Sequence, residues 1–91
     1  MTGEVSVVVL GWGSEPWLGE CVRSVLEQGP ILRECVLVDN GVDAASLASA
    51  MPADDAGQPD PRLLVVTPGE NLGFAGGCNE GARHTTAPVI A

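Results

Sequence analysis

The chain has 91 residues, of which 45% are hydrophobic, a composition that fits one small globular domain spanning residues 1–91 and argues against disorder. Twelve acidic residues against four arginines give a formal net charge of −8, which disfavours binding to nucleic acid or to anionic membranes. Since the sequence contains no run long enough to span a bilayer and no basic leader segment, we expect no transmembrane segment and a cytoplasmic location.

The first third of the chain predicts a strand followed by a helix. Residues 5–10 form a β-branched run typical of a strand buried on both faces of a parallel sheet, and Gly11-Trp12-Gly13 is expected to end it. Ser14 is expected to cap a helix whose apolar residues, between Leu18 and Leu26, follow helical spacing. Gly29-Pro30 then stops this helix.

The rest of the chain repeats this alternation. The pattern predicts, in order, a strand at 35–38, an alanine-rich helix from Asp43 to about Met51, a surface loop at 52–61, a strand at 63–66, a glycine-rich helix ending near His84, and a fourth strand beginning at 88–91. Such a β-α-β-α-β-α-β order is typical of an open parallel α/β sheet with flanking helices.

In such sheets, ligands bind at the carboxyl ends of the strands, where three loops of this chain should meet. Gly11 to Gly13, Asp39 to Gly41, and residues 68–73 follow the first three predicted strands. Asp39 can accept the imide N–H of uracil or thymine, or the paired donors of guanine. Alternatively, its oxygen bonds a following backbone N–H in a turn, as Asp-Asn-Gly sequences often do.

The glycine-rich segment 71–81 also allows two interpretations. Asn71 is suited to cap the third helix. Glycines inside a helix cost about 0.5–1 kcal/mol each relative to alanine, so Gly76, Gly77 and Gly81 require a compensating close contact, either with a ligand or with the sheet beneath.

Several other residues carry weaker signals. Trp12 and Trp17 can stack on a base or cover the sheet. His84 stands at a predicted helix end without catalytic partners. The cysteines are odd in number and lack metal-site spacing, so we expect small core residues with reduced thiols; they are Cys21, Cys35 and Cys78.

A dinucleotide-binding domain is a weaker alternative. It would require G-x-G-x-x-G after the first strand, but Pro16 stands where the third glycine belongs. Close packing of the following helix would be prevented there. The acidic Asp39 after the second strand fits both kinds of site and does not discriminate between them.

Taken together, four segments resemble the N-terminal part of the family 2 glycosyltransferases, and most closely the rhamnosyltransferase-like branch. These segments are Val5 to Trp12, Trp17 to Leu26, Val38 to Gly41, and Asn71 to Gly77. The resemblance covers essentially the whole chain. It implies a GT-A fold, which is Rossmann-like, and inverting transfer from a nucleotide-sugar donor.

The resemblance also implies roles for individual residues. Asp39 would bind the base, the loop of Gly11, Trp12 and Gly13 would lie against base and ribose, and Asn71 and Gly73 would border the nucleotide pocket. The metal-binding DxD motif and the catalytic carboxylate of the family would lie beyond Ala91. A divalent cation, Mg²⁺ or Mn²⁺, is therefore expected for the complete enzyme, with no ligands or catalytic residues in this segment.

Two functional hypotheses follow from these observations. In the first, the chain is a glycosyltransferase segment that binds the UDP, dTDP or GDP part of a donor and is inactive in transfer by itself. In the second, it is a non-catalytic α/β module or remnant, completed by self-association or by a partner chain at the edge of its unfinished fourth strand.

Overall fold

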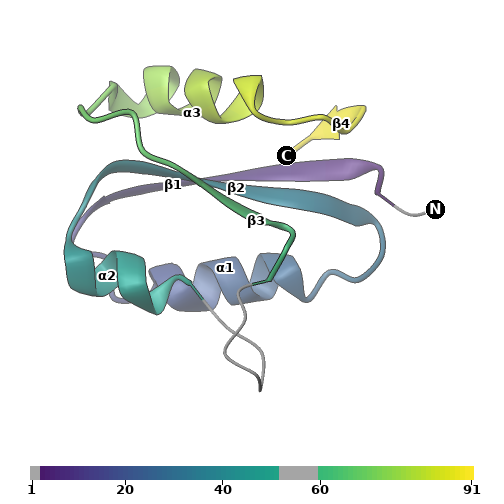
Figure 1. Cartoon of the computed structure of the whole chain (residues 1–91), viewed down its shortest axis with the longest axis horizontal. Helices are drawn as coiled ribbons and strands as arrows, with labels where there is room; N and C mark the ends of the chain where they lie inside the picture. Colours follow the sequence, from purple (N-terminus) through teal and green to yellow (C-terminus); the bar gives the residue numbers. More distant parts are fainter. Residues whose placement is uncertain (1–2, 52–59) are drawn as a thin grey trace.

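The computed structural model describes residues 3–51 and 60–91, which form one four-stranded parallel sheet with helices on both faces (Figure 1). The strand order is β3-β2-β1-β4. The elements are β1 (Val5–Gly13), α1 (Leu18–Leu26), β2 (Leu32–Val42), α2 (Ala44–Ser49), β3 (Leu63–Val66), α3 (Gly73–Arg83) and β4 (Val89–Ile90). The predicted open parallel α/β sheet is confirmed.

The helices form two layers. Helices α1 and α2 cover one face of the sheet, and α3 covers the other (Figure 1). The chain moves outward from β1 through β2 to β3 and then returns across the sheet to β4. Because parallel crossovers are right-handed, connections that run in opposite directions along a sheet lie on opposite faces.

The central strand β2 supplies most of the core. Cys35, Val36, Leu37 and Val38 are all fully buried, in agreement with a strand covered on both faces. Alternate residues point to opposite layers: Cys35 and Leu37 belong to the cluster around α1, whereas Val38 lies beneath Gly81 of α3. Val36 and Val38 thus pack toward α3, whereas Cys35 and Leu37 pack toward α1.

The first strand is longer than predicted. Instead of ending at Gly11, β1 continues to Gly13, because Gly11 pairs with Asp39 and Gly13 pairs with Val42 of β2. The register shifts between these two pairs. This backbone pairing carries the first loop to the same edge of the sheet as Asp39.

The predicted cap at Ser14 is wrong. Helix α1 begins after Trp17, with no side-chain cap, and the Leu18 N–H instead donates to the carbonyl of Glu15 in a turn. This turn precedes the helix because the Glu15 backbone N–H is held by Ser46 of α2 at 2.9 Å. The stretch after β1 is therefore anchored to α2 before α1 starts.

The second strand is also longer than predicted: β2 runs from Leu32 to Val42 and not only over 35–38, so Asp39 to Gly41 lie in its last residues rather than in a loop after it. The remaining boundaries follow the predictions more closely. Asp43 caps α2, which ends at Ser49, and β3 has the predicted bounds. The fourth strand lies beside β1, where Val5 pairs with Val89. Most of the predicted loop, residues 52–59, falls outside the described residues. Within the described part, no helix has the length and apolar character needed to cross a bilayer.

The prediction that all three cysteines pack as core residues is wrong for one of them. Cys35 is buried and Cys78 is half-buried, but Cys21 is exposed on α1. The apolar stripe of α1 is narrower than its sequence suggests, with Leu18, Val22 and Leu26 as its buried apolar residues. Cys21 lies beside that stripe.

Candidate functional site

Two neighbouring pockets lie at the carboxyl ends of the strands and share Asn71. The first, of about 250 Å³, is called here the Asp39 pocket; its lining includes Asp39, Gly41, Thr67, Gly69, Glu70 and Asn71. The second, of about 270 Å³, is called the Trp12 pocket; it is lined by Leu10, Trp12, Asn40, Asn71, Gly73 and Phe74. The last residues of β1 and β2 and the loop after β3 thus meet at one edge, where open α/β sheets bind ligands.

Asp39 uses one carboxylate oxygen in a turn. Its Oδ1 accepts the backbone N–H of Gly41 at 3.1 Å and that of Val42 at 2.8 Å. The turn interpretation of Asp39 is therefore confirmed. Among the described residues, none donates a hydrogen bond to Oδ2, so this oxygen is available to a ligand in the Asp39 pocket. The role of Asp39 in binding a base stays a prediction.

Two glycines let the backbone turn at this edge. Gly41 has φ +105° and Gly73 has φ +74°, both in the left-handed region that favours glycine. A Cβ on Gly41 would lie 3.7 Å from the indole of Trp12. Trp12 therefore lies close to the wall of the Asp39 pocket, over a residue that has no side chain.

Asn40 joins the loop after β3 to the end of β2. This side chain is only 2% exposed. Its Oδ1 accepts the Leu72 N–H at 2.8 Å, and its Nδ2 donates to the Gly73 carbonyl at 3.0 Å. Sequence reasoning missed Asn40, although a polar residue at the end of a buried strand, directly after Asp39, was a signal that could have identified it.

Asn71 is held by a hydrogen bond of its own. Its Oδ1 accepts the Gly73 N–H at 2.8 Å in an Asx turn that precedes α3, whose N-cap is Leu72. The predicted cap of α3 by Asn71 is therefore wrong, because no side chain caps this helix. In this turn, Asn71 stays between the Asp39 pocket and the Trp12 pocket and lines both.

Two glycines of α3 allow close packing on the sheet. A Cβ on Gly81 would overlap Val8 and lie 2.9 Å from Val38, and one on Gly77 would overlap Leu10 and lie 3.1 Å from the Asn40 amide. The contact that the sequence left open is therefore made with the sheet at both positions. The glycine-rich sequence brings α3 against the strands and places its first residues beside Asn40.

Gly11 and Gly13 stand apart from the other predicted site residues. A Cβ on Gly11 would lie 2.6 Å from Val42 and 3.2 Å from Leu18, so Gly11 serves the packing of α1 against the sheet. In the described part of the chain, neither glycine lines the Asp39 pocket or the Trp12 pocket. The structure brings Asp39, Trp12, Asn71 and Gly73 together around the two pockets, whereas Gly11 and Gly13 are not among the lining residues.

Helix α2 supports the end of β1, which carries Trp12. The backbone N–H of Trp12 donates to Oε1 of Glu15 at 2.7 Å, and Glu15 is in turn bound to Ser46. Asp43 accepts the Ser46 N–H at 2.7 Å, and the hydrogen bonds from Ser46 lower the pKa of this carboxyl below its ordinary value. The backbone N–H of Asp43 also reaches the Gly13 carbonyl at 2.9 Å.

Every aromatic side chain of the protein is exposed. Trp12 is 62%, Trp17 73% and Phe74 78% exposed, and the sequence contains no other Trp, Tyr or Phe. Neither tryptophan therefore covers the sheet. Trp12 and Phe74 both line the Trp12 pocket, where their ring faces are open to stacking.

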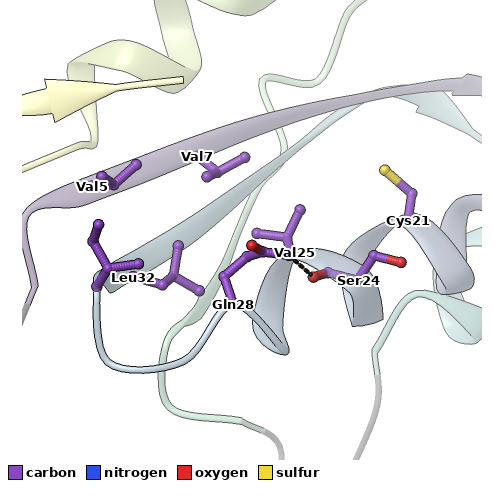
Figure 2. A pocket seen from close by; sticks show the side chains of 8 residues that line it. Val5, Val7, Cys21, Ser24, Val25, Gln28 and Leu32 are labelled. Atoms are coloured by element: carbon purple, nitrogen blue, oxygen red, sulfur yellow. Dashed lines mark hydrogen bonds between the residues drawn. The ribbon is translucent and has the colours of Figure 1, made fainter.

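A larger pocket lies at the opposite, amino end of the sheet. It has a volume of about 630 Å³ and opens between β1 and α1, with Val5, Val7, Val25 and Leu32 among its lining residues (Figure 2). Among the residues that the structure describes, those lining this pocket include no carboxylate and no histidine. Because it offers apolar contact and few groups that could orient a ligand, the pockets at the carboxyl ends are the better candidate site.

Among the residues that the structure describes, no group of three or more His, Cys, Asp or Glu side chains is placed to hold a metal ion. The two pockets contribute only Asp39 and Glu70 to such a set. The divalent cation expected from the family resemblance remains a prediction.

Comparison with known protein families places the chain. A sequence model described as glycosyl transferase family 2 matches residues 6–91, a range that includes every residue lining the Asp39 and Trp12 pockets. The chain belongs to glycosyl transferase family 2. No curated protein and no solved structure matches this family 2 chain. The family resemblance is confirmed, while the rhamnosyltransferase-like branch stays a prediction.

Proposed function

We propose that this glycosyl transferase family 2 chain binds the nucleotide of a nucleotide-sugar donor, with Asp39 as the acceptor for the base. The observation that carries the proposal is the open Oδ2 of Asp39 in the pocket at the carboxyl ends of β2 and β3. Family membership supplies the class of ligand. A carboxylate oriented by two backbone N–H groups is preorganised to accept an N–H from a ring.

The hydrogen bonds of Asp39 favour a base with one acidic ring N–H. Oδ1 already accepts from two backbone groups, Gly41 and Val42, so only Oδ2 remains for the ligand. Uracil and thymine present a single imide N–H to a carboxylate, whereas guanine presents two adjacent donors that are best met by both oxygens. We therefore propose a UDP- or dTDP-sugar in preference to a GDP-sugar.

The Trp12 pocket would accommodate an adjoining part of the donor. Asn71 lines both pockets, so a ligand bound at Asp39 can extend past it. Trp12 and Phe74 present exposed ring faces there, which suit contact with a planar or apolar ligand surface. The proposal concerns donor binding; transfer also needs stabilisation of the leaving diphosphate and a base for the acceptor, and it assigns neither task to the described residues.

Isothermal titration calorimetry of the 91-residue chain tests the proposal. UDP and dTDP should bind more tightly than GDP, and all three more tightly than ADP. Asp39→Asn keeps an oxygen for the turn but replaces the ligand-facing acceptor with a donor. Because a hydrogen bond to a charged group contributes about 1.5–3 kcal/mol, UDP affinity should fall at least tenfold while ADP affinity is unchanged.

Glu70→Gln is the matched control, since Glu70 lines the same pocket. Removing this negative charge should leave UDP affinity unchanged or raise it, because the diphosphate is also negative. Equal binding of all four nucleotides by the wild-type chain would contradict the proposal, as would an equal loss of UDP affinity in Asp39→Asn and Glu70→Gln.

A second candidate function is a non-catalytic α/β module completed by another copy or another chain. The observation that favours it is the exposure of β4, where Val89 is 52% and Ile90 is 50% exposed. A strand at a sheet edge offers unpaired backbone groups to a further strand. Its test is the oligomeric state of the chain in solution.

A further inference from the structure

We infer that Asn40 is a positioning residue of the donor site: its buried amide holds the loop after β3 so that Asn71 stands between the two pockets. This inference rests on the proposed function. Asn40 follows Asp39 in β2, but its side chain faces α3 and spans to a loop more than thirty residues away in the sequence. The end of β2 thus carries both Asp39, the proposed acceptor for the base, and Asn40, which anchors the loop after β3.

The two hydrogen bonds of Asn40 define the orientation of its amide. The Leu72 N–H can only donate, so Oδ1 must face it, and the Gly73 carbonyl can only accept, so Nδ2 must face that group. These partners are the two residues directly after Asn71. Their backbone is therefore held by one side chain that needs both a donor and an acceptor, a requirement that aspartate does not meet.

Helix α3 is shaped to admit this amide. At Gly77 a Cβ would lie 3.1 Å from Nδ2 of Asn40, which is closer than most Cβ contacts, and in ordinary contact with Cγ at 3.5 Å. The absence of a side chain at Gly77 leaves room for the amide between sheet and helix. With 2% of its surface exposed, Asn40 makes these bonds away from competing water.

Ser6 provides a matched control at the other end of the sheet. It is also a fully buried polar residue of a central strand, and it also anchors a distant segment: its hydroxyl donates to Glu34 at 3.0 Å and accepts the Ala87 N–H at 3.2 Å. Ser6→Ala and Asn40→Asp each disturb a buried hydrogen-bonding network. Of these two residues, only Asn40 adjoins the donor site.

The experiment compares UDP binding in the wild-type chain, Asn40→Asp and Ser6→Ala, with each affinity corrected for the folded fraction measured by urea denaturation. We expect at least a tenfold loss of UDP affinity in Asn40→Asp and no change beyond twofold in Ser6→Ala. Equal corrected affinities in all three proteins would overturn the inference. Failure of the wild-type chain to bind UDP would instead contradict the proposed function.

A measurement on the wild-type chain covers the case in which Asn40→Asp does not fold. Hydrogen exchange of the Leu72 amide, which donates to Asn40, should slow at least threefold when UDP is saturating. The Ala87 amide, which donates to Ser6, should exchange at an unchanged rate. Unchanged protection of Leu72 in the presence of bound UDP would overturn the inference.

Discussion

At the residue scale, the polar side chains of the carboxyl edge divide their hydrogen-bonding atoms between the fold and the site. Asp39 commits Oδ1 to the turn at the end of β2, and its Oδ2 remains available in the Asp39 pocket. Asn71 commits its Oδ1 to the Gly73 N–H. Asn40 commits both polar ends of its amide to the loop. The rigidity of the edge and its capacity to bind a ligand therefore come from the same few residues.

Asp43 gives a prediction about pH at this scale. The pKa of its carboxyl is lowered from 3.8, first by the hydrogen bond from the Ser46 backbone. A lowered folded-state pKa contributes stability above the unfolded value, and this contribution is lost as the pH falls through the folded value. Urea denaturation at several pH values should therefore show the wild type losing stability below about pH 4 relative to Asp43→Asn, whose cap does not titrate.

This comparison isolates one carboxylate. Asp60, whose pKa is also lowered by Arg62, is unchanged in both proteins, so its contribution cancels. A wild-type chain and an Asp43→Asn variant whose free energies of unfolding run parallel from pH 7 to pH 2 would contradict the prediction.

At the scale of the elements, the close approach of α3 to the sheet is the feature that connects packing to the site. Gly81 rests on Val8 and Val38, and Gly77 on Leu10 and Asn40. The amino end of this helix consequently lies where the Asn40 amide reaches the backbone of Leu72 and Gly73. Any change that moves the helix outward should disturb that anchor.

Gly81→Ala tests this packing. The added Cβ would overlap Val8, and the loss from overpacking, about 1–3 kcal/mol, should exceed the gain of up to about 1 kcal/mol in helix propensity. Thermal unfolding followed by circular dichroism should therefore show a lowered Tm. Gly76→Ala is the control, because a Cβ there would meet only the side chain of Leu72, at 3.0 Å. Equal Tm changes in the two variants would refute this account.

The strands were easier to predict than the ends of the elements. The buried run 35–38 and the strand 63–66 are visible in sequence because a parallel strand covered by helices is continuously apolar. The extension of β1 to Gly13 depends on backbone pairing with β2, which leaves no trace in side-chain pattern. The position of the first helix start depends on Glu15 meeting Ser46, thirty-one residues away.

The same distinction applies to the candidate site. Asp39, Asn71 and Gly73 could be placed at one edge because strand order alone brings those loops together. The anchoring role of Asn40 could not, because its partners come from a different loop and depend on how closely α3 approaches the sheet. Gly11 was assigned to the site by resemblance, but its surroundings, Val42 and Leu18, belong to the packing of α1.

At the scale of the whole molecule, a small core is combined with a strong negative charge and open sheet edges. The radius of gyration is 12.5 Å, close to the value of about 12 Å expected for a compact domain of this length. The edge strands β3 and β4 expose Leu64, Val89 and Ile90, each about half accessible to solvent. The net charge of −8 opposes the approach of a second copy to these edges.

Self-association should therefore depend on salt. The Debye screening length falls from about 10 Å at 0.1 M salt to about 3 Å at 1 M salt, which weakens the repulsion between two negatively charged copies. Light scattering should therefore show a monomer at low salt and a growing dimer fraction at high salt. Ile90→Lys should suppress the dimer, and Met51→Lys, which alters an exposed apolar residue directly after α2, should not. A monodisperse monomer at every salt concentration would count against the module hypothesis.

The placement of Trp12, Trp17 and Phe74 has a practical consequence for anyone who studies this chain by optical spectroscopy. Since both fluorophores are largely exposed in the folded state, their emission should already be red-shifted and should change little when the core melts. Tryptophan fluorescence would then report on the surroundings of the pockets but would change little on unfolding. Trp17→Phe would leave a single indole at Trp12, a built-in probe for ligand binding.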